Sequence, residues 1–91
     1  MIGMSVLYVE YMRDIFSTNL ALRLNTHEEL DKTITAVPYD EIIFDFSGVR
    51  SMSFEFAKEY LSIKNKSNKS INEVNLSLEL RPIMDKALQS N

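Results

Sequence analysis

The segment of residues 47–53 groups side chains that could bind or carry a charged ligand. It places three serine hydroxyls beside an arginine, with Asp45 shortly before it and Phe54 directly after it. Where such a segment leads into a helix, unpaired amides and the helix dipole stabilise an anion or a phosphate group. A structural interpretation stays open, in which Ser53 caps the helix and Asp45 accepts amides of the turn. The candidate site residues are Asp45, Ser47, Gly48, Arg50, Ser51, Met52, Ser53 and Phe54.

Catalysis and metal binding need residue types that are scarce in this chain. It has no Cys, two Gly and one His, which is His27. Glu28 and Glu29 follow His27, and we interpret this group as a solvated helix face, because a lone imidazole is a poor start for a metal site. No Ser-His-acid grouping can be argued from one His, and two glycines do not build a phosphate-cradling loop. We therefore expect no catalytic residue, no metal and no cofactor, and a protein that is not an enzyme.

The strongest structural signals lie on either side of the 47–53 segment. Residues 41–46 form a nearly continuous apolar run, which is typical of a strand covered on both faces in a parallel sheet. After the segment, apolar residues recur at helical spacing and predict a helix of about ten residues that begins near Ser53 or Phe54. Its stripe contains Phe56, Ala57, Tyr60, Leu61 and the aliphatic part of Lys64. The candidate site therefore joins a buried strand to a helix.

Weaker signals predict the elements before this unit. Residues 4–11 mix β-branched and aromatic side chains and predict a first strand, whereas residues 12–19 contain turn formers and predict a loop. Residues 20–24 form either a second short strand or an extended lead-in to a helix. Thr26 and Glu29 match a capping box, which predicts a helix that ends near Thr35, ahead of Pro38.

The elements after the central unit complete an alternating pattern. Residues 64–70 are a polar connector, and residues 71–76 predict a third strand. Ser77 then introduces a last helix, with Pro82 in its first turn. The alternation predicts a single α/β domain over residues 1–91, with a small, mostly parallel or mixed sheet of three to four strands packed with three helices.

The overall composition narrows the class of partner. The net charge of −3 argues against non-specific nucleic-acid binding, which needs a basic face. The apolar runs are too short to span a membrane, and the first residues do not resemble a signal peptide. We expect a cytoplasmic protein without membrane or nucleic-acid partners. Met52, Phe54 and Tyr11 flank loops, and their exposure would mark a contact with another protein.

The central sequence resembles the signature of STAS-like domains of unknown function, which themselves resemble anti-sigma-factor antagonists. That signature is a buried strand ending in Asp-Phe-Ser-Gly-Val, a short turn, a Ser, then a Phe-Ala pair and an acidic residue in the helix. The matching residues are Asp45 to Val49, Ser53, Phe56, Ala57 and Glu59. Leu22, Arg23, the helix from Thr26 and the closing run from Val74 to Ser77 also fit, so that the resemblance covers most of the chain.

The resemblance implies a regulatory protein–protein interaction module. Its partner would be a histidine-kinase-like ATPase or a similar protein, bound through the turn from Ser47 to Phe54 and the following helix. In anti-sigma antagonists a Ser at the start of this helix is phosphorylated, but Phe54 stands at that position here. A switch would then have to use Ser53 or Ser51. The alternative is a nucleotide or small-anion binding module at the same helix N-terminus, and a homodimer is a further expectation because edge strands need cover.

Overall fold

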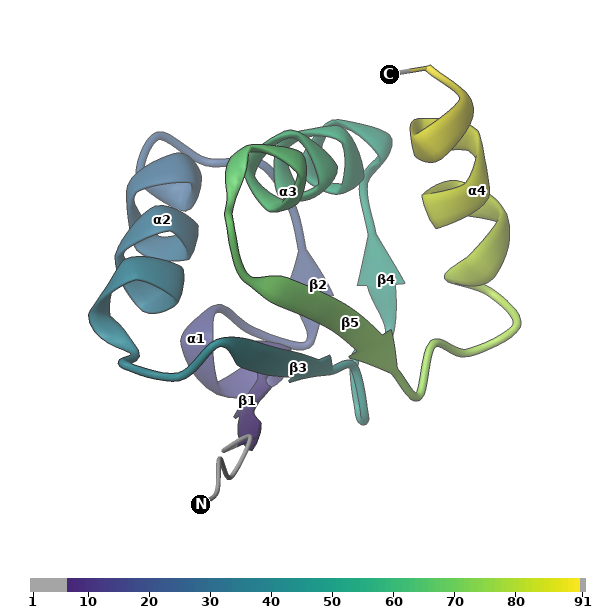
Figure 1. Ribbon diagram of the computed structural model, residues 1–91. Helices are drawn as coiled ribbons and strands as arrows, with labels where there is room; N and C mark the ends of the chain where they lie inside the picture. The colour runs from purple at the N-terminus through teal and green to yellow at the C-terminus, as the bar shows by residue number, and fades with distance from the viewer. Residues whose placement is uncertain (1–6, 91) are drawn as a thin grey trace.

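The computed structural model describes residues 7–90 and has an α/β architecture (Figure 1). Strands and helices alternate along the chain, and each strand pairing is parallel. In chain order the elements are β1 (Leu7–Tyr11), α1 (Met12–Ile15), β2 (Asn19–Leu20), α2 (Thr26–Ala36), β3 (Glu41–Asp45), β4 (Ser51–Met52), α3 (Phe54–Lys66), β5 (Ser70–Val74) and α4 (Arg81–Gln89). The α/β class expected from the sequence is confirmed. Residues 7–90 contain four helices where three were expected. The main sheet has three strands, in agreement with the expected three to four, and a separate two-stranded sheet was not expected.

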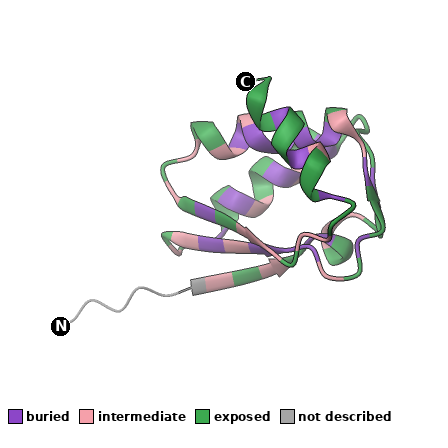
Figure 2. Ribbon diagram, turned by 90° about the vertical axis from the view of Figure 1, so that its right-hand side faces the viewer, coloured by how far each residue is buried: buried purple, intermediate pink, exposed green. Residues whose placement is uncertain are grey.

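The main sheet has the strand order β1-β3-β5, so the apolar strand β3 occupies its centre. Figure 2 shows the longer helices stacked on one side of this sheet. Ile42, Phe44 and Ile71 face them and are at most 4% exposed. The opposite side of the sheet is more open, since Val9 and Asn72 are exposed and Ile43 between them is half-buried. The core thus lies between the sheet and the helices α2, α3 and α4.

A second sheet of two strands includes Ser51 and Met52, which the sequence predicted to be part of a turn. In it, Asn19 pairs with Ser51 and Leu20 with Met52. Of the two alternatives for residues 20–24, a short strand is present, but it covers only Asn19–Leu20. Met52, which we expected at the surface, is 4% exposed because the pairing turns its side chain into the core beside Leu20.

The helix beginnings also differ in part from the sequence prediction. The expected loop of residues 12–19 contains the one-turn helix α1, because Met12 is fully buried and anchors it to the core. The predicted capping box of Thr26 and Glu29 does not form at the start of α2. Asn25 is the N-cap residue, and the Thr26 hydroxyl accepts a hydrogen bond from the Arg23 backbone N–H at 2.8 Å. The chain turns back at residues 23–26, which places Thr26 inside the first helical turn.

The last third of the chain follows the predicted order with shifted bounds. The strand β5 begins at Ser70 and ends at Val74, earlier than expected, because Asn75 adopts a positive φ of 60° and breaks the extended backbone. Ser77 does not cap α4. Its carbonyl accepts hydrogen bonds from the backbone N–H groups of Leu80 and Arg81 in the turn before the helix. Pro82 lies in the first turn of α4, as predicted.

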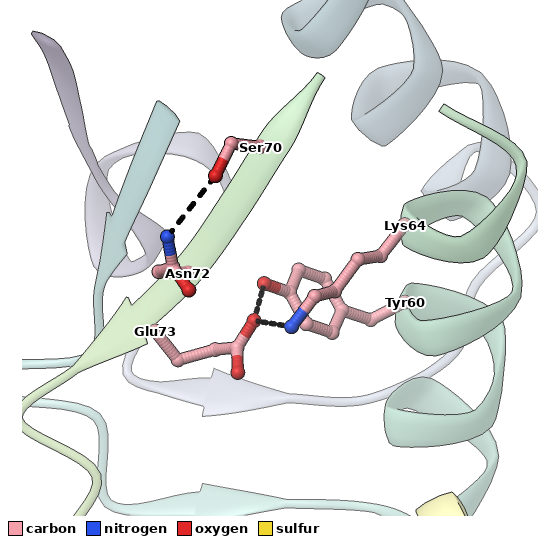
Figure 3. Close-up of polar contacts among 5 residues, drawn as sticks. All are labelled: Tyr60, Lys64, Ser70, Asn72 and Glu73. Atoms are coloured by element: carbon pink, nitrogen blue, oxygen red, sulfur yellow. Dashed lines mark hydrogen bonds and ion pairs between the residues drawn. The ribbon is translucent and has the colours of Figure 1, made fainter. Parts of the chain in front are cut away.

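A polar contact joins α3 to β5 in the space between the helix and the strand (Figure 3). Glu73 points from the strand toward the helix, whereas Ser70 and Asn72 lie on the other side of the strand. One Glu73 carboxylate oxygen accepts hydrogen bonds from the Tyr60 hydroxyl at 2.5 Å and from Lys64 Nζ at 2.8 Å. Burial and the neighbouring Glu73 charge raise the pKa of Tyr60 well above its ordinary value. The contact satisfies a tyrosine hydroxyl that burial would otherwise leave unpaired.

Lys69 closes the end of a helix that is distant from it in the sequence. Its Nζ donates to the backbone carbonyl of Ile34 at 2.6 Å and also to that of Val37, at the C-terminal end of α2. Helix ends leave such carbonyls without helical partners, and the negative end of the dipole attracts a cation there. Lys69 therefore fixes the α3–β5 connection against α2.

We expect Lys69→Met to lower the free energy of unfolding by about 1–3 kcal/mol, because two carbonyls lose a charged donor. Urea denaturation followed by circular dichroism measures this loss. Lys66→Met is the matched control, since Lys66 is exposed in the last turn of α3 and should change stability by less than about 0.5 kcal/mol. Equal losses for the two variants would contradict the capping role.

The helices are short relative to a lipid bilayer. Within residues 7–90, no helix combines the length and apolar character needed to cross a membrane.

Candidate functional site

Asp45 is the centre of the polar contacts in the candidate segment. Its side chain lies at the end of β3 and is 8% exposed. One carboxylate oxygen, Oδ1, accepts hydrogen bonds from the Ser47 backbone N–H at 2.8 Å, the Ser47 hydroxyl at 2.6 Å and Asn75 Nδ2 at 3.0 Å. Asp45 therefore ties the turn after β3 to the turn after β5.

These contacts favour the ionised form of Asp45. The hydrogen bond from the Ser47 hydroxyl is the largest cause that lowers the pKa of Asp45, and burial acts in the opposite direction. Asn75, the Ser47 amide and the positive charge of Arg13 lower this pKa further. A carboxylate held in this way is a structural anion rather than a general base, since its proton affinity is decreased.

Gly48 lets an arginine from another element cover this turn. It has a φ of 79°, which L side chains rarely adopt, and the Val49 N–H donates to the Phe46 carbonyl across the turn. A Cβ placed on Gly48 would lie 2.8 Å from Arg13 Nη1. The positive φ is what favours glycine at this position, since the exposed and flexible Arg13 side chain could move away from an added Cβ.

The backbone amides of the segment are largely engaged within the protein. Residues 18–20 lie along it, so that Arg50 and Ser51 donate to the Thr18 carbonyl and Ser53 donates to the Leu20 carbonyl. The Ser51 hydroxyl donates to Asn19 Oδ1 at 2.8 Å. An anion at this part of the segment would have to displace these carbonyls, so the amides of Arg50, Ser51 and Ser53 give little support for anion binding.

The end of the segment starts α3. Ser53 is the N-cap residue, and its hydroxyl accepts a hydrogen bond from the Phe56 backbone N–H at 3.1 Å. Phe54 is half-buried, with Lys58 Nζ and Lys86 Nζ at 5.5 Å and 5.3 Å from its ring centroid. Phe54 thus lies between two ammonium groups, one from α3 and one from α4.

Exposed leucines lie beside the start of α3. Leu22 is 46% exposed and lines a shallow groove with Glu55, Lys58 and Glu59 of that helix. Leu24, two residues along the same loop, is completely exposed. We call Leu22, Leu24 and the groove residues Glu55, Lys58 and Glu59 the leucine-loop surface.

The structure brings most of the predicted site residues together, but not as one exposed patch. Arg50 and Ser51 are exposed, Ser47 and Ser53 are half-buried and already bonded, and Met52 belongs to the core. Sequence reasoning missed the roles of Arg13, Asn19 and Asn75. Only Asn75 carried a usable signal, because Asn after a strand is a frequent choice for a left-handed backbone.

The described residues were also compared with the requirements of a metal site, and the chain was compared with known proteins. Within the described residues, no group of three or more His, Cys, Asp or Glu side chains is placed to hold a metal ion. His27 instead forms a hydrogen bond with Glu59, which links α2 to α3. Comparisons of the chain with protein-family models, with curated proteins and with solved structures found no match.

Proposed function

We propose that the protein is a STAS-like regulatory module that binds another protein through the leucine-loop surface and the adjoining face of α3. The partner would be a histidine-kinase-like ATPase or a similar regulatory protein, as the resemblance to anti-sigma-factor antagonists implies. The exposure of Leu22 and Leu24 beside the start of α3 is the observation that carries this proposal.

Physical reasons support a protein as the ligand. Burial of an exposed leucine side chain against a partner is favourable. Complete burial of one leucine contributes about 1.5–3 kcal/mol to the free energy of binding. Glu55, Lys58 and Glu59 line the groove beside Leu22 with charged side chains, and interfaces usually combine an apolar centre with such a polar rim. Hydrogen bonds between residues 18–20 and the 47–53 segment anchor the start of the loop that carries Leu22 and Leu24, which lowers the entropic cost of association.

The second candidate, a nucleotide or small-anion binding module, has weaker support. It relies on the helix N-terminus, where the Ser53 hydroxyl already caps the Phe56 amide. A thermal-shift panel with nucleotides and phosphate separates the two functions. A clear rise in melting temperature with a nucleotide would favour the second candidate over the first.

Photo-crosslinking in cells of the source organism tests the proposed function. A photoreactive residue at position 22 or 24 should capture an ATPase with a histidine-kinase-like domain, and one at Asn68 in the α3–β5 connection should not. With the purified ATPase, Leu22→Asp should weaken binding about tenfold or more, because a charge replaces an apolar contact. Asn68→Asp is the matched control and should leave the affinity unchanged.

An aspartate at position 53 can mimic a phosphorylated Ser53 and still cap the N-terminus of α3. Ser53→Asp keeps an acceptor for the Phe56 amide, so that it adds a charge while α3 still begins at the same place. We expect this variant to unfold at the same temperature within a few degrees and to bind the ATPase more weakly. Crosslinks that are identical from positions 22, 24 and 68, or an unchanged affinity for Leu22→Asp, would refute the proposed surface.

A further inference from the structure

The strand β1 forms an edge of the main sheet that has few of the usual protections. The sheet order β1-β3-β5 leaves one side of β1 without a neighbouring strand among residues 7–90. Natural edge strands are protected by charges, prolines or bulges, because their open hydrogen-bonding groups attract other strands. The sequence of β1 is Leu-Tyr-Val-Glu-Tyr, which contains one charged residue, Glu10. That carboxylate already accepts a hydrogen bond from the Tyr8 hydroxyl at 2.7 Å.

The other edge of the sheet differs in character. The strand β5 places Ser70 and Asn72 at the surface, and Lys69 precedes it. Exposed polar side chains make this edge a poor template for pairing. Of the two edges, β1 is therefore the better template for pairing with another strand.

A groove lies beside β1 and has room for the side chains of an added strand. It has a volume of about 440 Å³ and is bounded by Tyr8 and Glu10 on the strand, by the turn at Pro38 and Tyr39, and by one side of α2. The rings of Tyr8 and Tyr39 contact one another at 5.8 Å between centroids. The added strand would therefore pair along the edge and place alternate side chains against these rings.

We propose that this edge pairs with the same strand of a second copy, in an antiparallel register centred on Val9. The sequence of β1 is complementary to itself in that register. Val9 lies opposite Val9 of the second copy, and each Tyr8 lies opposite a Glu10, so that no like charges face one another and each Tyr8–Glu10 hydrogen bond can be remade across the interface. The product is a two-fold symmetric dimer with one continuous six-stranded sheet.

Two further features of β1 and its surroundings fit a second copy. Val9 is 44% exposed, and the two-fold axis would bury it against its own counterpart. The α2 side of the groove carries Glu29 and Lys32, whose opposite charges leave no excess of one sign there to repel a second copy. The proposed dimer leaves the leucine-loop surface out of the interface and does not depend on the proposed function.

Paired charge variants at position 9 test the register directly. Sedimentation velocity of the full chain from about 10 μM to about 1 mM should show a concentration-dependent dimer. Val9→Lys and Val9→Glu should each be monomeric over this range, because like charges would meet on the axis. An equimolar mixture of the two variants should regain a dimer, since Lys then faces Glu.

The matched control lies in the same row of the sheet. Asn72 aligns with Val9 through Ile43, so Asn72→Lys adds the same charge to the opposite edge and should leave the dimer intact. The proposal is overturned if the unaltered chain is monomeric at about 1 mM, as it would be if another segment or another protein covers β1. It is also overturned if Val9→Lys stays dimeric, if Asn72→Lys is the variant that dissociates, or if the mixture stays monomeric. Circular dichroism of each variant confirms that the fold is retained.

Discussion

Phe44→Ala should lower the free energy of unfolding by about 3–5 kcal/mol, the largest effect of any single change considered for this protein. Phe44 is fully buried in the central strand, and its ring meets the Tyr60 ring edge-on at 5.6 Å between centroids. Removal of the ring leaves a cavity between the sheet and α3. A domain of this length has a total stability on the order of 5–10 kcal/mol, so the variant should be close to unfolding at physiological temperature.

Guanidinium denaturation followed by circular dichroism measures this loss. The matched control is Ile43→Ala, one residue earlier on the same strand but on its half-exposed side, with an expected loss of about 1 kcal/mol. If the two variants lost equal stability, the core would not lie on the side of the sheet that Phe44 occupies.

Asp45→Ala should lower the free energy of unfolding by about 2–3 kcal/mol at pH 7, because Ser47 and Asn75 lose a buried, charged acceptor. Asp45→Asn should lose less, since the amide oxygen can still accept one or two of these hydrogen bonds. Urea denaturation gives both values. The control is Asp85→Asn on the exposed side of α4, which should change stability by less than about 0.5 kcal/mol.

The stabilisation by Asp45 should also depend on pH in a defined direction. The pKa of this carboxyl is lowered in the folded protein, mainly by the Ser47 hydroxyl, so as the pH falls the unfolded chain binds a proton first. The stabilisation is complete above the unfolded pKa of about 4 and is lost as the pH falls through the lower, folded pKa. The difference in stability between the unaltered chain and Asp45→Asn should therefore shrink from pH 5 to about pH 2. A constant difference over this range would contradict the role of the charge.

The central strand and the helix after it could be predicted because their signals are local and strong. The apolar run around Phe44 leaves no alternative to a buried strand, and the spacing of Phe56 and Tyr60 repeats at the helical period. The Ser53 cap also followed from sequence, since a serine directly before an apolar helical pattern is a frequent start.

The remaining features depend on contacts between distant residues, which one sequence does not encode in a readable form. Strands of two residues have no periodicity, so the pairing of Leu20 with Met52 could not be predicted and Met52 was placed at the surface. Asn25 and Thr26 are both suitable N-cap residues, and only the turn of the chain at Arg23 selects between them. The cation beside Asp45 comes from Arg13, which lies in a segment expected to be a loop.

The all-parallel arrangement of the main sheet has a consequence for how the chain reaches its native state. Leu7 pairs with Glu41 and Glu41 pairs with Ser70, so the strands that pair lie roughly thirty residues apart and no hairpin joins them. Each pairing must wait for an intervening helix to form and close the loop, which favours a slow folding rate for a chain of this size. We expect the first lasting structure to be β3, α3 and β5 together, with β1 added last. Until β1 arrives, one side of the most apolar strand is open, and that interval is when the newly made chain is most exposed to aggregation.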